Sequence, residues 1–347
     1  MALTVDIEKK YKGFTLRAAF RAGDETMALL GASGSGKSMT LRCIAGIETP
    51  DRGRIELDGV TLFDSEKRIN LAPQRRRVGM MFQHYALFPQ MTVRQNVACG
   101  ARGSLKGAEG KRAVEEELEA FDLRELADRH PSQLSGGQQQ RAALARMMIS
   151  KPNILMMDEP FSALDSHLRF RMEEEVRRVI RRFGKTVILV SHNRDEVFRM
   201  ADRVAILREG SIERIGTRKE VFSDPGTRSA CLLTGCKNVS AIRRTGDGRA
   251  EATEWGIVLS APLKADTCAL GIRMHSILPG EGENAFRCRV EEEIENPFSY
   301  TVMLRPLEAK DGSVPIGWEM EKPVWEKMKA AELTVHFPAK DLLQLRG

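Results

Sequence analysis

The chain has 347 residues, of which 42% are hydrophobic and 29% are charged. This composition is ordinary for a globular protein and excludes a disordered, collagen-like or low-complexity chain. Because domains usually hold roughly 100–200 residues, the length predicts two of them. The longest apolar runs, such as Ile154 to Met157, are far shorter than the roughly 18–20 residues of a membrane-spanning helix, so we expect none.

The formal net charge of +6 is compatible with binding to nucleic acid or anionic lipid. The basic residues nevertheless lie among acids, which is typical of a solvated helix face. An example is the group Arg177, Arg178, Arg181 and Arg182, which follows the stretch Glu173 to Glu175. We therefore expect no nucleic-acid partner.

The N-terminus shows no apolar stretch after a basic segment, so we expect no secretory signal and residence in the cytosol. The six cysteines are scattered, and none of their spacings repeats the paired pattern of a zinc site. We expect reduced, structural thiols.

Up to about residue 235, short apolar runs alternate with helical stretches, which predicts an α/β domain with a largely parallel sheet. Three runs are apolar throughout, as strands covered on both faces are: Thr26 to Leu30, Ile154 to Met157 and Thr186 to Val190. Between the first two, the stretch Val114 to Arg129 predicts an amphipathic helix. We expect a helical subdomain at about residues 86–151, inserted into the α/β core.

From residue 236 to 347 the pattern changes to short strand-like segments separated by turns rich in Gly, Pro and Asp. These segments are Gly256 to Ser260, Ala269 to His275, Ala285 to Glu293, Ser299 to Arg305 and Leu333 to Phe337. We therefore expect residues 1–235 to form one domain and residues 236–347 to form a second, β-rich domain.

A phosphate-binding loop is predicted at residues 31–38, GASGSGKS, which fits G-x-x-x-x-G-K-[ST] between a buried strand and a helix beginning near Met39. Its glycines let N–H groups surround a β-phosphate, Lys37 adds a full charge, and Ser38 is placed to ligate magnesium. The residues expected to bind ATP here are Gly31, Ser33, Gly34, Ser35, Gly36, Lys37, Ser38 and Met39. The alternative is a glycine-rich turn that includes a lysine by chance.

Two carboxylates follow the apolar run at residues 154–157, and a buried parallel strand would expose them beside the phosphate loop. Asp158 is placed to hold the shell of a magnesium ion, and Glu159 to accept a proton from an attacking water. The alternative is that Asp158, Glu159 and Pro160 merely open a helix with favourable N-terminal charge.

A third element, LSGGQQQR at residues 134–141, lies just upstream of the acidic strand. It resembles the signature motif of ABC-type ATPases, and the phosphate loop, signature and acidic strand stand in that family's order. Ser135, Gly136 and Gly137 open a helix and so form a second anion site. The resemblance implies a P-loop, RecA-like core and a head-to-tail dimer, in which each signature faces the partner's phosphate loop.

Further positions match the family residue by residue. Gln83 resembles the glutamine that touches the magnesium and the attacking water, and Asp165 resembles a residue of the dimer-interface loop. His192 resembles the histidine that contacts the γ-phosphate, and Tyr11 resembles the aromatic residue that stacks on adenine. The other histidines lack such a context, and we interpret them as structural or exposed: His84, His130, His167, His275 and His336.

Beyond the ATPase domain, LGIR at 270–273 and LTVHFP at 333–338 resemble parts of the OB-like (TOBE-like) β-barrel appended to ATPase subunits of bacterial importers. Residues 71–79, 82–89 and 234–238 look most like those of molybdate and sulfate importer subunits, although sugar, polyamine and iron importers share much of this sequence. The resemblance implies a peripheral subunit on the cytoplasmic face of the membrane. Its partners would be a second copy, permease subunits and, indirectly, an external solute-binding protein.

Two other functions compete with the importer motor. A soluble ABC-type ATPase acting on DNA or ribosomes would carry a long coiled coil or a second cassette, and an exporter cassette is commonly fused to spanning helices. Contact with the permease is expected after Gln83, at residues 84–97, through Tyr85, Leu87, Phe88 and Met91. For the second domain, an oxyanion-sensing site and a dimerisation module remain alternatives.

Overall fold

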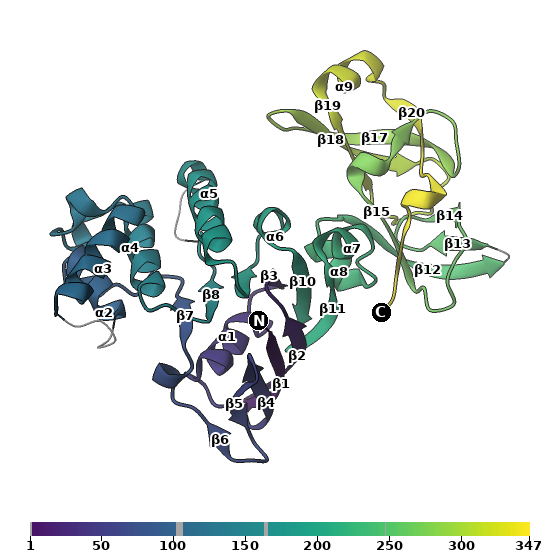
Figure 1. Ribbon diagram of the computed structural model, residues 1–347. Helices are drawn as coiled ribbons and strands as arrows, with labels where there is room; N and C mark the ends of the chain where they lie inside the picture. The colour runs from purple at the N-terminus through teal and green to yellow at the C-terminus, as the bar shows by residue number, and fades with distance from the viewer. Residues whose placement is uncertain (1, 102–106, 163–165, 247) are drawn as a thin grey trace. The chain divides into compact units, whose positions relative to one another are not determined.

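The computed structural model describes residues 2–101, 107–162, 166–246 and 248–347 (Figure 1). The chain divides into two compact units, the first ending at Arg218 and the second beginning at Lys219. The expected boundary after residue 235 therefore lies inside the second unit. Two short helices lie between the expected boundary and the observed one, α7 (Arg218–Ser223) and α8 (Arg228–Leu233). Their helical sequence pattern resembles that of the preceding α/β segment.

One sheet of eleven strands, in the order β6-β5-β4-β1-β2-β11-β10-β3-β9-β8-β7, forms the first unit. Its strands are β1 (Leu3–Tyr11), β2 (Phe14–Ala22), β3 (Thr26–Leu30), β4 (Arg52–Leu57), β5 (Val60–Asp64), β6 (Ile69–Asn70), β7 (Val78–Met81), β8 (Ile154–Asp158), β9 (Val187–Ser191), β10 (Arg203–Arg208) and β11 (Ser211–Thr217). Strands β10, β3, β9, β8 and β7 are parallel neighbours. Every residue of β3, β8 and β9 is buried, so the three expected buried strands are confirmed, with β9 shifted by one residue.

The helices of this unit are α1 (Lys37–Ala45), α2 (Val93–Gly100), α3 (Gly107–Ala120), α4 (Gly136–Met148), α5 (Ser166–Phe183) and α6 (Arg194–Met200), with 3-10 turns at Pro73–Arg75, Arg124–Leu126 and Pro131–Gln133. In Figure 1, α2, α3 and α4 lie together as a helical subdomain. None of the described helices is both long and apolar enough to span a bilayer.

The helix expected from Val114 to Arg129 is wrong in its bounds, because α3 ends at Ala120. Asp122 adopts a left-handed conformation with φ 51°. The N–H of Leu123 donates to the carbonyl of Leu118 at 2.8 Å, and that of Asp122 to Glu119 at 3.1 Å. These two bonds close the helix in the manner of a Schellman motif, with aspartate where glycine is usual.

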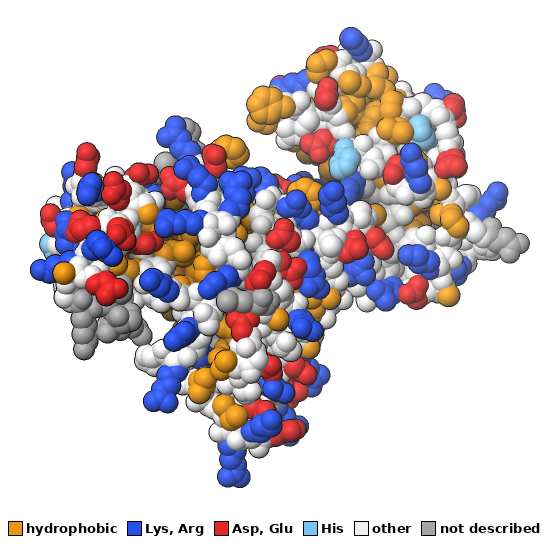
Figure 2. All heavy atoms as spheres, viewed as in Figure 1, with side chains coloured by type: hydrophobic (Ala, Val, Ile, Leu, Met, Phe, Trp, Pro, Cys, Tyr) orange, Lys and Arg blue, Asp and Glu red, His pale blue; other side chains and the backbone are white. Residues whose placement is uncertain are grey.

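The solvated face expected on α5 is also wrong in one residue. Glu173 is only 1% exposed. Arg199 of α6 donates to it through Nε and Nη2, both at 2.7 Å. Its sequence neighbours Glu174 and Arg178 are exposed, and Figure 2 shows acidic and basic side chains interspersed over the visible face of the first unit. The acidic run therefore includes one buried charge that fixes α6 on α5.

The second unit contains two five-stranded sheets, ordered β14-β13-β12-β15-β21 and β16-β20-β17-β18-β19, whose strand pairs are antiparallel. The strands are β12 (Asn238–Gly246), β13 (Arg249–Ala252), β14 (Ile257–Ser260), β15 (Ala269–Ile272), β16 (Leu278–Pro279), β17 (Ala285–Glu295), β18 (Ser299–Pro306), β19 (Ile316–Glu321), β20 (Glu332–His336) and β21 (Leu343–Leu345). A helix, α9 (Lys322–Met328), and 3-10 turns at Met274–Ser276 and Ala339–Asp341 complete it. The expected β-rich fold is confirmed, with β15 ending before the turn at Met274.

Candidate functional site

The predicted site residues follow the ends of neighbouring parallel strands. The phosphate loop follows β3, Gln83 follows β7, Asp158 ends β8 with Glu159 next, and His192 follows β9. Because β7, β8, β9 and β3 are parallel neighbours, their carboxyl ends meet at one edge of the sheet. In open α/β sheets this edge is the usual place for a ligand.

The phosphate loop connects β3 to α1 and buries its lysine. The Lys37 side-chain amine donates to the carbonyl oxygens of Gly31 and Ala32, each at 2.8 Å. Burial lowers the pKa of Lys37, while the carboxylates of Glu159 and Asp158 oppose that shift. Gly36 has φ 103°, and a Cβ there would lie 2.9 Å from the Leu16 side chain, so both conformation and space require glycine.

Ser38 and Asp158 come from elements far apart in the sequence and meet beside Lys37. The Ser38 hydroxyl donates to Asp158 Oδ1 at 2.8 Å. Burial raises the pKa of Asp158, which is 7% exposed, and the hydrogen bond from Ser38 opposes the shift. A hydroxyl and a carboxylate oxygen are the hard ligands that Mg²⁺ accepts. These two side chains therefore fit a magnesium site.

Glu159 and His192 form a pair at the same edge. His192 Nδ1 lies 3.1 Å from Glu159 Oε1. Glu159 is held in a left-handed conformation with φ 47°, and its N–H donates to the carbonyl of Val190 at 3.0 Å. Backbone strain in a non-glycine residue is often concentrated at functional sites. Here it turns Glu159 out of β8, directly after the buried Asp158.

The loop carrying His192 is fixed from both sides. The Ser191 hydroxyl donates to Glu196 at 2.7 Å and accepts from the N–H of Asn193 at 2.9 Å. The Asn193 side chain caps α6. Burial raises the pKa of Glu196, and the hydrogen bond from Ser191 and the charge of Arg169 on α5 oppose that shift. These contacts orient the backbone on both sides of His192.

Two aromatic residues lie near the phosphate loop, and sequence reasoning identified only one. The Tyr11 hydroxyl is buried without a hydrogen-bond partner among the described residues, and burial raises the pKa of Tyr11 to about 12. Phe14 starts the next strand, 6.1 Å from Tyr11 between ring centroids. A Cβ on Gly36 would meet the Phe14 ring at 3.1 Å. Phe14 therefore touches the loop directly, and its place at the turn after Tyr11 was the available signal.

The remaining predicted residues are not joined to this group by any hydrogen bond or ion pair between described residues. Gln83 is exposed in the turn after β7. Ser135 is the exposed N-cap of α4, and Gly136 and Gly137 form its first turn. A capping box closes this end, because Ser135 and Gln138 each accept the other's N–H, at 3.4 Å and 2.9 Å. Asp165 lies outside the described residues.

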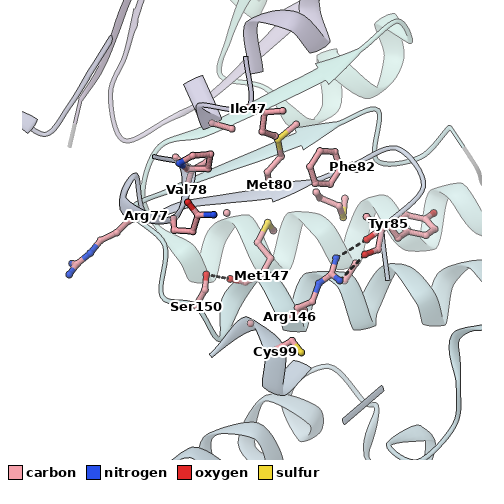
Figure 3. A pocket seen from close by; sticks show the side chains of 18 of the residues that line it. Ile47, Arg77, Val78, Met80, Phe82, Tyr85, Cys99, Arg146, Met147 and Ser150 are labelled. Atoms are coloured by element: carbon pink, nitrogen blue, oxygen red, sulfur yellow. Dashed lines mark hydrogen bonds between the residues drawn. The ribbon is translucent and has the colours of Figure 1, made fainter. Parts of the chain in front are cut away.

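A pocket of about 550 Å³, lined by Phe82 and Tyr85 on either side of Gln83 in the sequence, lies between the α/β core and the helical subdomain (Figure 3). Its walls come from the end of α1, from β7, from the segment after Gln83, from α2 and from α4. The lining mixes apolar and polar side chains. The apolar ones include Ile47, Met80, Phe82, Tyr85, Phe88 and Met147, and the polar ones are Gln74, Arg77, Arg146 and Ser150. Of the four residues expected to contact a permease, Tyr85 and Phe88 line this pocket, whereas Leu87 and Met91 do not.

The fold and the edge define a class: a parallel sheet with a phosphate loop and an acidic strand is a P-loop nucleotide-binding core. Comparison with known proteins makes this specific. The family described as "ABC transporter" matches residues 18–162. The sulfate/thiosulfate import ATP-binding protein CysA of Caulobacter vibrioides is 43% identical over 259 residues, covering 73% of this chain and 74% of that protein. The chain belongs to the ABC transporter ATP-binding proteins, a family of ATPases.

Other relatives carry polyamine names. The spermidine/putrescine import ATP-binding protein PotA of Lawsonia intracellularis is 47% identical over 205 residues, covering 59% of this chain and 54% of that protein. The putrescine transport ATP-binding protein PotG of Escherichia coli is 44% identical over 240 residues, covering 69% and 60%. The match thus spans little more than half the length of these two relatives.

A solved structure supports the fold. The ATP-binding cassette MJ0796, in a dimeric post-hydrolysis state bound to ADP and Pi, is 29% identical with a TM-score of 0.52. The likeness covers 63% of this chain and 99% of that chain. The expected ABC ATPase core is confirmed.

Proposed function

We propose that this chain is the ATP-hydrolysing motor subunit of an ABC importer. The observation that carries the proposal is the convergence of Lys37, Ser38, Asp158, Glu159 and His192 at one edge of a parallel sheet. A phosphate-binding loop alone would support nucleotide binding. A carboxylate beyond the magnesium ligands adds a base for hydrolysis.

Each residue has a distinct task in the proposed reaction. Lys37 exchanges the carbonyls of its own loop for phosphate oxygens, and Ser38 and Asp158 hold Mg²⁺, with Gln83 as a further contact. The metal supplies charge neutralisation on the phosphates. Glu159 accepts the proton of the attacking water. His192 orients Glu159 through their 3.1 Å contact and faces the γ-phosphate.

The signature residues are proposed to act on the nucleotide of a second copy. Ser135, Gly136 and Gly137 form the accessible N-terminus of a 13-residue helix, which favours an anion. No described hydrogen bond or ion pair joins them to Lys37 or Ser38. The structure of MJ0796 is dimeric and bound to ADP and Pi, and by analogy we propose a head-to-tail dimer that encloses ATP. Asp165 is proposed to lie at the dimer interface.

The pocket beside Gln83 is proposed to receive a short helix of the permease. The apolar part of its lining suits the apolar face of an amphipathic helix. Phe88 is 47% exposed and lines the pocket, so its ring is available to a partner. This contact would place the chain at the cytoplasmic face of the membrane.

For the transported solute we propose a small ion, with sulfate or thiosulfate first and a polyamine as the alternative. The CysA match covers 73% of the chain, more than the 218 residues of the first unit, so it extends into the second unit. The polyamine names of PotA and PotG support the alternative. The comparisons give no support to molybdate.

The test is reconstitution of the chain with its cognate permease in proteoliposomes that carry the solute-binding protein. Phosphate release should rise with lumenal sulfate or thiosulfate; a rise with spermidine or putrescine instead would select the alternative. Phe88→Ala and Leu87→Ala should abolish the stimulation while the chain alone still binds ATP. A chain that hydrolyses ATP but never associates with the permease would favour a soluble ABC ATPase.

A further inference from the structure

The segment after Gln83 has an unusual backbone. Tyr85 and Ala86 are consecutive non-glycine residues in the left-handed region, with φ 59° and φ 47°. The N–H of Ala86 donates to the carbonyl of His84 at 2.6 Å. A bond from residue i+2 to residue i across a residue with positive φ is the rare, strained form of the three-residue turn. Such a conformation persists only where its surroundings enforce it.

Arg146 of α4 supplies that enforcement (Figure 3). Its Nη1 donates to the carbonyl of Ala86 at 2.8 Å, and its Nη2 donates to the carbonyl of Tyr85 at 3.0 Å. One planar guanidinium thus binds the carbonyls of two successive residues at once. The same guanidinium lies 5.5 Å from the Phe88 ring centroid. The Tyr85 side chain is 4% exposed, which anchors the turn on its other side.

The contacts of Arg146 connect three parts of the first unit. Arg146 is in the last turn of α4, the helix that begins with the signature residues at Ser135. Tyr85 follows two residues after Gln83, which follows β7. Tyr85, Ala86, Phe88 and Arg146 all line the pocket. One side chain therefore joins the Gln83 segment, the pocket wall and the signature helix.

We propose that Arg146 is a positioning residue, a latch that holds the Gln83 segment on α4 so that nucleotide binding, pocket and signature motif move together. The inference rests on the proposed function. It adds a residue and a strained turn through which the nucleotide edge and the pocket are coupled. With the latch open, Tyr85 and Ala86 relax to ordinary φ values, and Gln83 moves independently of α4.

Cys99 provides a reporter in the pocket wall. All six cysteines are described; four are buried, Cys268 is exposed and Cys99 is partly exposed. In the full chain carrying Cys268→Ser, N-ethylmaleimide should react mainly at Cys99. Adding Glu159→Gln keeps bound ATP from being hydrolysed. The measured quantity is the ratio of alkylation rates with and without ATP and Mg²⁺.

The latch predicts that ATP changes this rate by roughly 2- to 30-fold, the range found for residues that couple two sites. Arg146→Met should bring the ratio close to one, and Arg146→Lys should lower it, since an ammonium cannot bind two carbonyls as a fork. Ala86→Gly added to Arg146→Met should restore part of the ratio, because glycine adopts positive φ readily. Loss of packing alone would not be rescued in this way.

Arg199→Lys is the matched control. It also breaks a two-bond arginine fork, to Glu173, but Arg199 does not line the pocket, and the ratio should not change. A ratio of one in the parent, or an undiminished ratio in folded Arg146→Met, overturns the latch. Loss of ATP hydrolysis by the unmodified chain would instead overturn the proposed function, because that assay does not involve Cys99.

Discussion

Replacing Glu159 by glutamine separates ATP binding from hydrolysis. The amide preserves the shape of the side chain and can still contact His192, 3.1 Å away, but it cannot accept a proton from water. General-base assistance is worth roughly 10²–10⁴-fold in rate, or about 3–5 kcal/mol in the activation barrier. Lys37, Ser38 and Asp158 are unchanged, so the affinity for ATP should persist. A dimer that cannot hydrolyse ATP should accumulate.

The assays are phosphate release, equilibrium ATP binding, and size-exclusion chromatography with light scattering with and without ATP and Mg²⁺. Glu209→Gln is the control, because Glu209 is also a glutamate with positive φ, at 48°, and its side chain is exposed. Hydrolysis by Glu159→Gln within a few-fold of the unmodified rate would refute the base assignment. A monomer at saturating ATP would refute the dimer.

Three further predictions concern binding and stability. Lys37→Ala should abolish ATP binding in titration calorimetry, since the loop loses its one full charge; unchanged affinity would refute the loop assignment. Asp158→Asn should weaken Mg²⁺-dependent ATP binding yet stabilise the nucleotide-free chain to urea at pH 7. Burial raises the pKa of Asp158, so the folded chain favours the protonated carboxyl. The contribution of Asp158 to the free energy of unfolding is therefore greatest at low pH and is lost as the pH rises through the raised pKa. The gain from asparagine should therefore vanish in acid. Arg199→Met should destabilise the chain by about 3–5 kcal/mol, because Glu173 is left buried and unpaired; adding Glu173→Gln should recover much of the loss.

The sequence predicted those parts of the fold in which local pattern and tertiary environment agree. The run Ile154 to Met157 is apolar throughout because β8 is covered on both faces. Strand β3 is likewise buried along its whole length. The loop motif after it therefore places Lys37 and Ser38 at the start of α1. Contacts between elements that are distant in the sequence left at most an indirect signal, such as the place of Phe14 at the turn after Tyr11. Phe14 reaches the phosphate loop only because β1 and β2 pair across a two-residue turn.

The predicted end of α3 was wrong because an unusual residue, Asp122, closes the helix. Glycine normally marks the end of a helix, and Asp122 takes its place here, so the sequence pattern of α3 continues past the last residue of the helix, Ala120. The strained turn at Tyr85 and Ala86 was equally invisible, since neither residue type indicates positive φ. Its cause, Arg146, lies sixty positions further along the chain. Hydrophobic periodicity does not predict hydrogen bonds between residues so far apart in the sequence.

The Lys37 side chain has hydrogen-bond acceptors within its own loop, the carbonyls of Gly31 and Ala32. Nucleotide binding is therefore an exchange of acceptors, and the measured affinity reports the difference between two sets of charge-assisted bonds. These acceptors belong to the loop itself, so the Lys37 ammonium has partners whether or not phosphate oxygens are at hand. Bound ATP then adds stability only by mass action, about 2.7 kcal/mol at a hundredfold excess over Kd. A cassette built in this way can release its product without leaving a buried charge alone.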